Sequence, residues 1–206
     1  MKRKLGIVCI VLGLGMLLGA LAIYGCNELE SERAGISAQH TVELVREQIQ
    51  QSPEKETVPA ETDPSSPRMT VVDIDGFGYI GYVSIPRLKL ELPVMDQWDE
   101  ARLKIAPCRY SGTTMEDDLV LMAHNYRRHF GPIRRLNVND EVIFVDMDGQ
   151  SITYLVAATD VVSPKSVEDV TSGAYDLTLF TCTYGGESRV VVYCNRAVPA
   201  SSQCDS

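Results

Sequence analysis

The residues most suited to chemistry flank two consecutive glycines, Gly185 and Gly186, near the C-terminal end of the chain. Two glycines between apolar stretches predict a two-residue hairpin turn. In that register Cys182 lies directly opposite Arg189, and opposed side chains share a face with Cβ atoms about 4.5–5.5 Å apart. A neighbouring cation favours the nucleophilic thiolate, and an arginine can donate hydrogen bonds to a substrate carbonyl or a developing oxyanion. The sequence therefore predicts a reactive thiol at the open end of this hairpin, on the ribbon face opposite Cys194.

A histidine would complete the minimal set for acyl transfer, because a thiolate attacks the carbonyl and an imidazolium protonates the leaving amine. His124 ends an apolar run, 118–124, so we expect it at the end of a strand, where it can share a groove with the cysteine. His129 follows five residues later, beside Arg127 and Arg128. We expect this second histidine at the surface, outside the catalytic group.

The elements that must position these residues are mostly short strands. The stretch 85–94 alternates leucines with charged residues between two prolines, which predicts one half-buried strand. Residues 147–150 predict a hairpin turn, and helical signals are confined to short turns at 98–105 and 130–137. Many short strands with turn residues between them are typical of a mainly β fold with a closed or nearly closed barrel. The other predicted strands are 118–124, 141–146, 151–162, 176–182 and 189–196.

The N-terminus predicts a membrane anchor. Residues 5–24 carry no charge and are long enough to cross a bilayer as a helix, and the basic residues at positions 2–4 favour a cytoplasmic N-terminus. We predict residues 1–26 as a cytoplasmic tip and a single-pass, uncleaved transmembrane signal anchor, with the rest of the chain extracytoplasmic. A cleaved signal peptide is an alternative, although no Ala-x-Ala-like site is present, and Cys26 leaves a lipoprotein cleavage site open.

Residues 27–68 predict an extracytoplasmic stalk and linker. Apolar residues at 42, 45 and 49 share one helical face, whereas 52–68 hold four prolines among polar residues and predict an extended segment. We expect the catalytic domain to span 69–198, with a tail at 199–206. Because the anchor, stalk and linker are expected to add no core residues, this domain is predicted to fold and work on its own.

Charge and composition narrow the possible partners. The net charge of −9 argues against nucleic acid, since an acidic surface repels a phosphate backbone. The six cysteines show neither regular spacing nor a Cys-x-x-Cys pair, which favours a free thiol over a disulfide framework. The acids Glu116, Asp117 and Asp118 make calcium conceivable, but we interpret them as a solvated turn and expect no cofactor and no metal.

Three segments resemble the sortases, the cysteine transpeptidases of Gram-positive bacteria. LTLFTC (177–182), followed by Arg189 and a valine-rich strand, resembles the family's Thr-Leu-x-Thr-Cys…Arg signature. LMAHN (121–125) resembles the family's histidine segment, and GYVSIPRLKLELPV (81–94) resembles the strand that opens the sortase barrel. The likeness covers about residues 78–197, and the anchor and stalk match the family as well.

The resemblance implies an eight-stranded sortase barrel and the cleavage of surface proteins at an LPxTG-like C-terminal sorting signal. Cys182 would attack the threonine carbonyl, and an amine of a cell-wall precursor or a pilin lysine would resolve the thioacyl enzyme. His124 would be the acid/base and Arg189 would steady the substrate. Arg196, farther along the strand, would be structural.

Two departures bear on the class of sortase. Segment 163–175 is too short for the long helical insert of class B enzymes, and Asp63-Pro64 is followed by Ser65 where class C lids carry an aromatic residue. We therefore expect a class A-, D- or E-like enzyme.

Two other functions stay open. One is a peptidoglycan L,D-transpeptidase, although its typical run with His close before Cys is absent, and the other is a non-catalytic surface module with structural cysteines.

Overall fold

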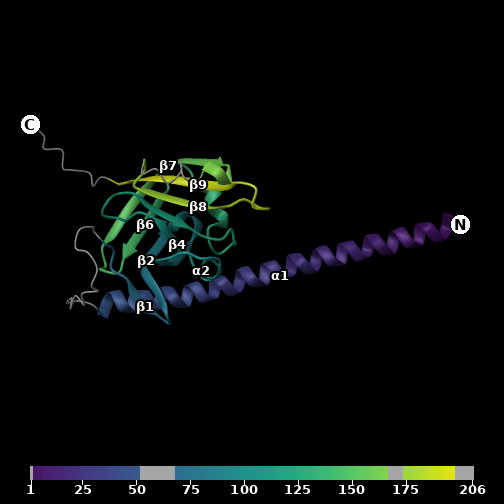
Figure 1. Ribbon diagram of the computed structural model, residues 1–206, viewed down its shortest axis with the longest axis horizontal. Helices are drawn as coiled ribbons and strands as arrows, with labels where there is room; N and C mark the ends of the chain where they lie inside the picture. Colours follow the sequence, from purple (N-terminus) through teal and green to yellow (C-terminus); the bar gives the residue numbers. More distant parts are fainter. Residues whose placement is uncertain (1, 52–67, 167–173, 198–206) are drawn as a thin grey trace, which may run out of the picture.

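The longest element is a helix that joins the predicted anchor to the predicted stalk. The computed structural model describes residues 2–51, 68–166 and 174–197. Helix α1 (Lys2–Gln51) is continuous. Its N-terminal half extends well beyond the rest of the molecule, and its C-terminal half lies against a barrel of strands (Figure 1). Most of the predicted linker and the whole predicted tail at 199–206 lie outside the described residues.

Eight strands close into a barrel in the order β2-β3-β4-β5-β8-β9-β7-β6, because β6 pairs back with β2. Strand β1 pairs with the start of β2 outside this ring. The pairs β3–β4 and β5–β8 are parallel. The prediction of a mainly β, eight-stranded barrel with short helices is confirmed.

The strands and short helices that follow α1 have these bounds, where η marks a 3-10 helix: β1 Val72–Ile74, β2 Phe77–Ile85, η1 Pro86–Leu88, β3 Leu90–Met95, α2 Glu100–Leu103, β4 Cys108–Ser111, β5 Leu119–Met122, η2 Gly131–Arg135, β6 Glu141–Asp146, β7 Ser151–Val162, η3 Pro164–Ser166, β8 Leu177–Cys182 and β9 Arg189–Arg196.

Closure of the barrel depends on one glycine in β2. Gly81 lies beside a register irregularity in the β2–β3 pairing and has φ +143°. A Cβ atom at this position would lie 2.0 Å from the carbonyl oxygen of Val145 in β6. Glycine is therefore required where the backbone of β6 comes this close to that of β2.

The single strand predicted over 85–94 is wrong, because the chain turns a corner there. Strand β2 ends at Ile85, and Pro86 starts the turn η1, where its fixed φ suits a first helical position. Lys89 then adopts a left-handed conformation with φ +53°, and the chain reverses so that Ile85 pairs with Leu90. The alternation of leucine with charged residues thus spans a tight corner and the strand that follows it.

The barrel interior forms the main hydrophobic core. On β8, Leu177 and Leu179 belong to this interior cluster, whereas Phe180 belongs to a separate cluster on the outer face with Val120 and Val191. Alternate residues of a strand point to opposite faces. The two clusters therefore show which residues at the strand ends face outward.

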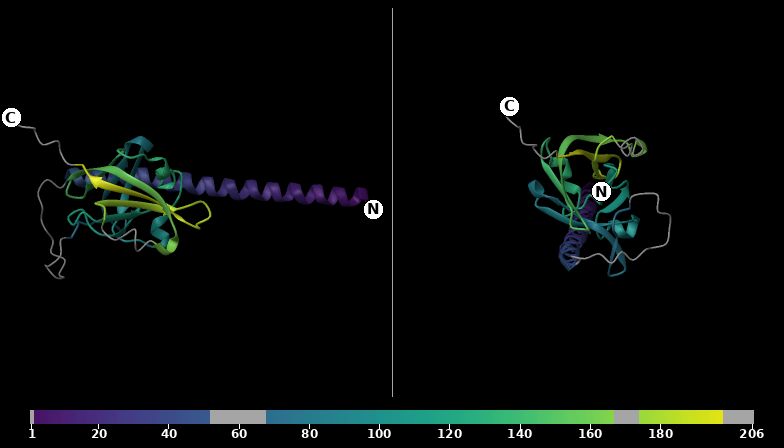
Figure 2. Two further views of the ribbon diagram at one scale, coloured as in Figure 1. Left: turned by 90° about the horizontal axis from the view of Figure 1, so that it is seen from above. Right: turned by 90° about the vertical axis from the view of Figure 1, so that its left-hand side faces the viewer.

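The stalk half of α1 is part of this packing, which corrects the prediction that it adds no core residues. Ala38 and Val45 are fully buried, and Val42 is 3% exposed. The predicted apolar face is confirmed, since Ile49 also packs against the cluster that contains Val45. Figure 2 shows this half of the helix running alongside the strands. The folding unit therefore includes the second half of α1, and removing it would expose a buried surface.

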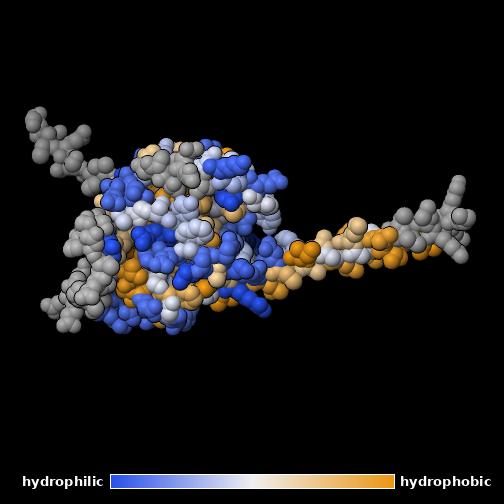
Figure 3. Space-filling model, in the orientation of Figure 1, coloured by the Kyte–Doolittle hydropathy of each residue, from blue (hydrophilic) through white to orange (hydrophobic). Residues whose placement is uncertain are grey.

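The first half of α1 has a different character. Within Ile10–Gln51, an 18-residue window has a mean hydropathy of 1.9 and no buried share. Figure 3 shows mostly hydrophobic side chains where the helix leaves the barrel. This part of the helix is long and apolar enough to cross a membrane.

Candidate active site

Three neighbouring strands bring the three predicted site residues into one row. Cys182 ends β8 and pairs with Arg189, which begins β9, so the register predicted from the sequence is confirmed. Strand β5 lies on the other side of β8 and runs parallel to it, with Met122 opposite Phe180. Continued by two residues, this register places His124 beside Cys182, one strand spacing of about 4.8 Å away.

Two side-chain hydrogen bonds hold this register beyond the end of β5. The Thr181 hydroxyl donates to the carbonyl oxygen of Ala123 at 2.8 Å. The Asn125 amide donates to the carbonyl oxygen of Thr183 at 3.3 Å. These bonds fix the residues on both sides of His124 to the residues on both sides of the cysteine. The sequence analysis did not assign roles to Thr181 and Asn125, although both lie within the quoted motifs.

The row faces the outside of the barrel. Val120, Phe180 and Val191 form the outer cluster. Cys182 lies two residues after Phe180, and side chains two apart share a face. The histidine and the arginine are likewise an even number of residues from Val120 and Val191. All three side chains therefore belong to the outer face.

The β8–β9 connection keeps the predicted register with a longer loop than predicted. The Thr183 amide donates to the Ser188 carbonyl at 2.9 Å, and the Gly186 amide donates to the Thr183 carbonyl at 2.9 Å. The loop thus consists of the four residues 184–187. Gly185 and Gly186 have φ values of +92° and +78°, which few other residues adopt. Four loop residues preserve the same pairing as two.

His124 is set up to exchange a proton. Its Nε2 atom is buried and makes no hydrogen bond to any residue that the structure describes. Its ring stacks on Tyr126, with centroids 4.8 Å apart. Burial lowers the pKa of His124 below its usual value, and the nearby Glu100 carboxylate opposes that shift only in part. The imidazole is therefore neutral at pH 7 and can accept a proton.

Arg189 lies over its own hairpin loop. Its Nη1 atom donates to the carbonyl oxygens of Gly186 at 3.0 Å and Ser188 at 3.1 Å. Among the described residues no carboxylate forms an ion pair with it. The guanidinium therefore keeps a positive charge that no neighbouring acid neutralises, at the end of the hairpin that carries the thiol.

A groove of about 870 Å³ opens beside the cysteine. Of the three predicted site residues, only Cys182 lines this groove, and His124 and Arg189 do not. Its walls come from the β8–β9 loop, the segment after β5, the turns η1 and η2, and the helix α1. Among its described lining residues, the charged ones are mainly basic: Arg87, Lys89, Arg127, Arg134 and Arg135, with Glu28 acidic.

His129 does not lie at the surface as predicted. It is fully buried, and its ring packs against Tyr126 with centroids 5.4 Å apart. Burial lowers the pKa of His129 to about 4; the neighbouring His124 adds to the shift, and the Ala34 backbone opposes it. Helix α1 thus covers this histidine, which explains why the polar sequence around it gave the wrong expectation.

Cys26, Cys108, Cys182 and Cys194 are free. Cys108 and Cys194 are buried, and burial raises the pKa of each thiol to about 12. Cys194 pairs with Leu177 on the other face of the ribbon, as predicted. Cys182 is partly exposed. The barrel therefore presents the thiol of Cys182 to solvent and keeps the other two inert.

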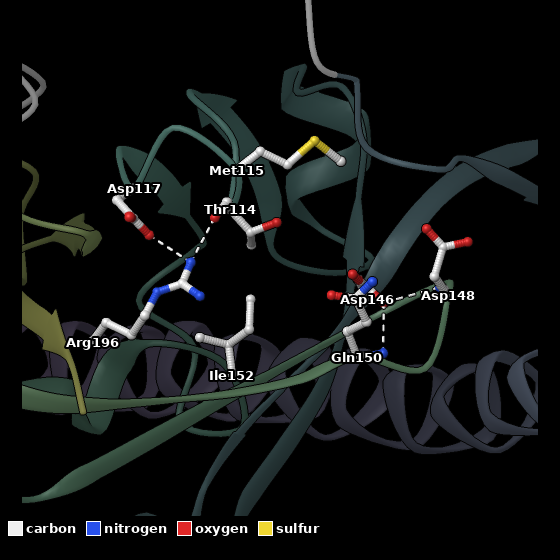
Figure 4. A pocket seen from close by; sticks show the side chains of 8 residues that line it. All are labelled: Thr114, Met115, Asp117, Asp146, Asp148, Gln150, Ile152 and Arg196. Atoms are coloured by element: carbon white, nitrogen blue, oxygen red, sulfur yellow. Dashed lines mark hydrogen bonds and ion pairs between the residues drawn. The ribbon is translucent and has the colours of Figure 1, made fainter. Parts of the chain in front are cut away.

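A second hollow, of about 380 Å³, lies at the opposite ends of the strands (Figure 4). There Arg196 pairs with Asp117 and donates to the Thr114 carbonyl at 2.7 Å, which agrees with its predicted structural role. The Asp146 carboxylate accepts hydrogen bonds from the backbone amides of the β6–β7 turn. Within the described part of the chain, no group of three or more His, Cys, Asp or Glu side chains is placed to hold a metal ion.

An aromatic strip on the outer face was also missed by the sequence analysis. Trp98 stacks on Tyr110 at 5.7 Å, and Tyr110 meets Phe180 edge to face at 5.3 Å. Trp98 is 45% exposed. Because Phe180 shares a face with Cys182, the strip leads toward the thiol. Scattered aromatic residues gave no local signal of this, since the strip forms only when β4 and β8 are placed in one sheet.

Comparisons with known proteins agree with this architecture. The family model described as "Sortase domain" matches residues 83–197, more than half of the chain. The search of curated proteins gave no match. Among solved structures, sortase C1 from Streptococcus agalactiae is 27% identical, with a TM-score of 0.54 over 63% of this chain and 72% of that one.

Two clostridial structures are more distant in sequence and show the fold alone. A sortase C from Clostridium perfringens, solved with the C-terminal cell wall sorting motif, is 21% identical, with a TM-score of 0.54 over 78% of this chain and 91% of that one. A sortase D5 transpeptidase from the same species is 21% identical, with a TM-score of 0.51 over 58% and 79%. The family match, the closed eight-stranded barrel and the cysteine at the end of β8 lead to one conclusion. The chain belongs to the sortase family and is a sortase-type cysteine transpeptidase.

Proposed function

We propose that Cys182 is the nucleophile of this transpeptidase, His124 its general acid/base and Arg189 the group that steadies the substrate carbonyl. The substrates are surface proteins with an LPxTG-like C-terminal sorting signal. The acceptor is an amine of a cell-wall precursor or a pilin lysine. The observation that carries the proposal is the pairing of Cys182 with Arg189, together with the β5–β8 register, which brings His124 beside the cysteine when it is continued two residues beyond the end of β5.

The chemistry follows from the surroundings of each residue. The neutral imidazole of His124 takes the proton of the Cys182 thiol, and the sulfur attacks the threonine carbonyl carbon. The C–N bond breaks, and the leaving nitrogen takes the proton from His124. The acceptor amine then attacks the thioester, gives its proton to His124 and releases the thiolate. In each tetrahedral intermediate Arg189 donates hydrogen bonds to the oxyanion.

The peptide binds along the outer face. The aromatic strip begins at Trp98, which is 45% exposed, and continues through Tyr110 to the buried Phe180, two residues before Cys182 on β8. Apolar and aromatic side chains predominate in ligand sites. This strip suits the apolar leucine and proline of the sorting signal. The same reaction can end in hydrolysis when water replaces the amine, which gives a thiol protease activity.

The enzyme is held at the outer surface of the membrane. Tyr24, the last residue of the predicted span, lines the same groove as Cys182. The β8–β9 loop also projects toward the N-terminal end of α1 in two views (Figures 1 and 2). With the N-terminus in the cytoplasm, the thiol lies just outside the bilayer. A sorting signal next to a membrane-embedded segment can reach it there.

The class of sortase and the absence of a cofactor stay predictions. The lid position at Asp63-Pro64 lies outside the described residues, so the structure gives no test of the class. We propose that the reaction needs neither metal nor cofactor, because the thiol, imidazole and guanidinium supply every proton and charge that the steps above use. Activity should therefore be the same with and without a chelator.

The test is to incubate the full chain in detergent micelles with a library of sorting-signal peptides and an amine acceptor. Mass spectrometry of the intact enzyme should show an acyl adduct on Cys182 and, with the acceptor present, an amide product. An adduct on another cysteine would overturn the assignment of the nucleophile. If the acyl adduct forms but no amine tried gives an amide product, the enzyme is a protease and the transfer step is contradicted.

A further inference from the structure

The loop that carries His124 is attached to the membrane helix. The Arg127 backbone amide donates to the Ser31 hydroxyl at 3.1 Å, and Ser31 is 4% exposed. Arg127 also pairs with Glu28 at 3.4 Å. One turn farther along α1, Glu32 pairs with Arg128 at 2.8 Å. These three contacts join one face of α1 to two consecutive loop residues, Arg127 and Arg128.

A glycine in α1 makes this approach possible. A Cβ atom on Gly35 would lie 1.9 Å from Cδ of Arg128, 2.7 Å from its Cβ and 2.9 Å from its Cγ. The whole stem of the arginine therefore crosses the helix at the place where the helix has no side chain. In contrast, a Cβ atom on Gly25 of the same helix would meet nothing within 4 Å.

Displacements of this loop reach His124 through direct contacts. The Phe130 amide donates to the His124 carbonyl at 3.2 Å. The ring of Tyr126 lies between the rings of His124 and His129, at centroid distances of 4.8 and 5.4 Å. A shift of residues 127–130 therefore moves the stack in which the His124 ring sits.

We propose that the segment 28–35 of α1 is a positioning element of the active site, which holds His124 beside Cys182 by clamping the loop that carries it. This inference rests on the proposed role of His124. Its consequence is that the anchor does more than tether the enzyme. The catalytic group is complete only while the barrel is docked on its own membrane helix.

The contacts argue for positioning rather than for a large contribution to stability. Both ion pairs are exposed, with side chains between 38% and 79% accessible, and exposed pairs add little stability. Catalysis is more sensitive, because a displacement of about 1 Å of a reacting group can cost on the order of 100-fold in rate. A loosened clamp should therefore lower kcat while the protein stays folded.

The pH dependence gives a second signature. The charged groups that act on His124 are Glu30 from α1 and Glu100 and Lys104 from the region of α2, and burial holds its pKa low. His129 lies on the other side of Tyr126 and is neutral above pH 5, because its pKa is lowered to about 4. Releasing the clamp would hydrate His124, so the acid limb of the kcat profile should move to higher pH.

The experiment compares Gly35→Ala with Gly25→Ala in the full chain in detergent micelles. Alanine favours a helix over glycine, so neither change should lower the melting temperature by weakening the helix itself. We expect kcat for Gly35→Ala to fall about 10- to 100-fold, with KM for the peptide unchanged and the acid limb shifted upward. Gly25→Ala should match the wild type in all three quantities.

A double-mutant cycle tests the route through Arg128. In the Arg128→Gly background the stem is gone, so adding Gly35→Ala should cost nothing further. Glu32→Gln should lower kcat by a smaller factor, and Glu43→Gln, on an exposed part of α1, should not. Wild-type kcat and pH profile for Gly35→Ala would overturn the inference. Equal losses with and without Arg128, or a loss that only follows a lower melting temperature, would overturn it as well.

The proposed function is checked in the same assay by the wild type and by Cys182→Ala. If the wild type forms the amide product and Cys182→Ala does not, the proposed function stands, whatever the glycine variants show. If the wild type is inactive on every peptide, the function fails first. The clamp is then contradicted only if the His124 titration, followed by NMR, is the same in Gly35→Ala and Gly25→Ala.

Discussion

Strand β9 carries an arginine at each end, and the two have opposite surroundings. Arg196 pairs with Asp117, donates to the Thr114 carbonyl and lies over the ring of Tyr154 at 6.0 Å. Arg189 contacts only loop carbonyls in the described structure and lies opposite Cys182. The same residue type thus closes a surface network at one end of the strand and remains available to a substrate at the other.

The two hollows differ in the same way. At the Arg196 end the carboxylates already accept bonds from Arg196 and from the β6–β7 turn. At the Cys182 end a partly exposed thiol, a neutral imidazole and an unneutralised guanidinium come together. Polar groups that satisfy one another hold a fold together, whereas groups left unsatisfied are ready to act on a ligand. This contrast supports the proposal that catalysis takes place at the Cys182 end of the barrel.

The largest expected effect is the loss of the nucleophile. Cys182→Ala should abolish both peptide cleavage and transfer, because no other side chain in the row can form the thioacyl intermediate. Cys194→Ala, on the opposite face of the ribbon, should keep the wild-type kcat and lose some stability. Product formation by liquid chromatography and mass spectrometry measures both. Substantial cleavage of an LPxTG-like peptide by Cys182→Ala would contradict the proposed mechanism.

Removal of the acid/base should come second. His124→Ala should lower kcat/KM about 10²–10⁴-fold, the usual range for this kind of group. In the wild type, burial lowers the pKa of His124 below 6.5, so the imidazole stays neutral as the pH falls to that value. The acid limb of kcat/KM should therefore have its midpoint below pH 6.5. A midpoint above that value would contradict the role of a buried His124.

The two arginines of β9 give the direct test of the comparison. Arg189→Ala should lower kcat about 10²–10³-fold, as expected for loss of an oxyanion donor. Arg189→Lys should recover only part of the rate, since lysine lacks the planar fork. Arg196→Ala should leave kcat unchanged and lower the free energy of unfolding. If instead Arg196→Ala lowers kcat and Arg189→Ala does not, the two ends have been assigned the wrong way round.

The sequence predicted the site end of the molecule well because its signals are local. The strands predicted at 141–146, 151–162 and 189–196 occur with those bounds as β6, β7 and β9. The pairing of Cys182 with Arg189 needed only the two glycines and the alternation of faces along a strand. Even the longer loop preserved it, because the loop takes one residue from each strand and leaves the pairing of Cys182 with Arg189 unchanged.

What could not be predicted depends on contacts between distant segments. The helical face at 42, 45 and 49 was visible in the sequence, but nothing local shows that it packs on the barrel across an intervening proline-rich segment. His129 follows two arginines and reads as polar, yet α1 covers it. The corner at Pro86–Leu88 was missed because its leucine continues the alternation of the strand after it.

The smallest expected effect concerns the stability of the fold at acidic pH, to which His129 contributes. The pKa of His129 is about 4 in the folded protein and about 6.5 when unfolded. Between these values the unfolded chain binds the proton and the folded chain does not, so stability is complete above pH 6.5 and declines as the pH falls toward 4. Over that whole range the free energy of unfolding falls by roughly 3 kcal/mol.

Denaturation of wild type and His129→Phe at pH 7 and pH 5 measures this loss of stability. His129→Phe should lose about 2 kcal/mol less than the wild type over that interval, whereas His40→Gln, in the exposed part of the stalk, should behave as the wild type does. Equal losses in all three proteins would mean that His129 binds its proton as readily in the folded protein as in the unfolded chain, and that α1 does not exclude water from the loop behind His124.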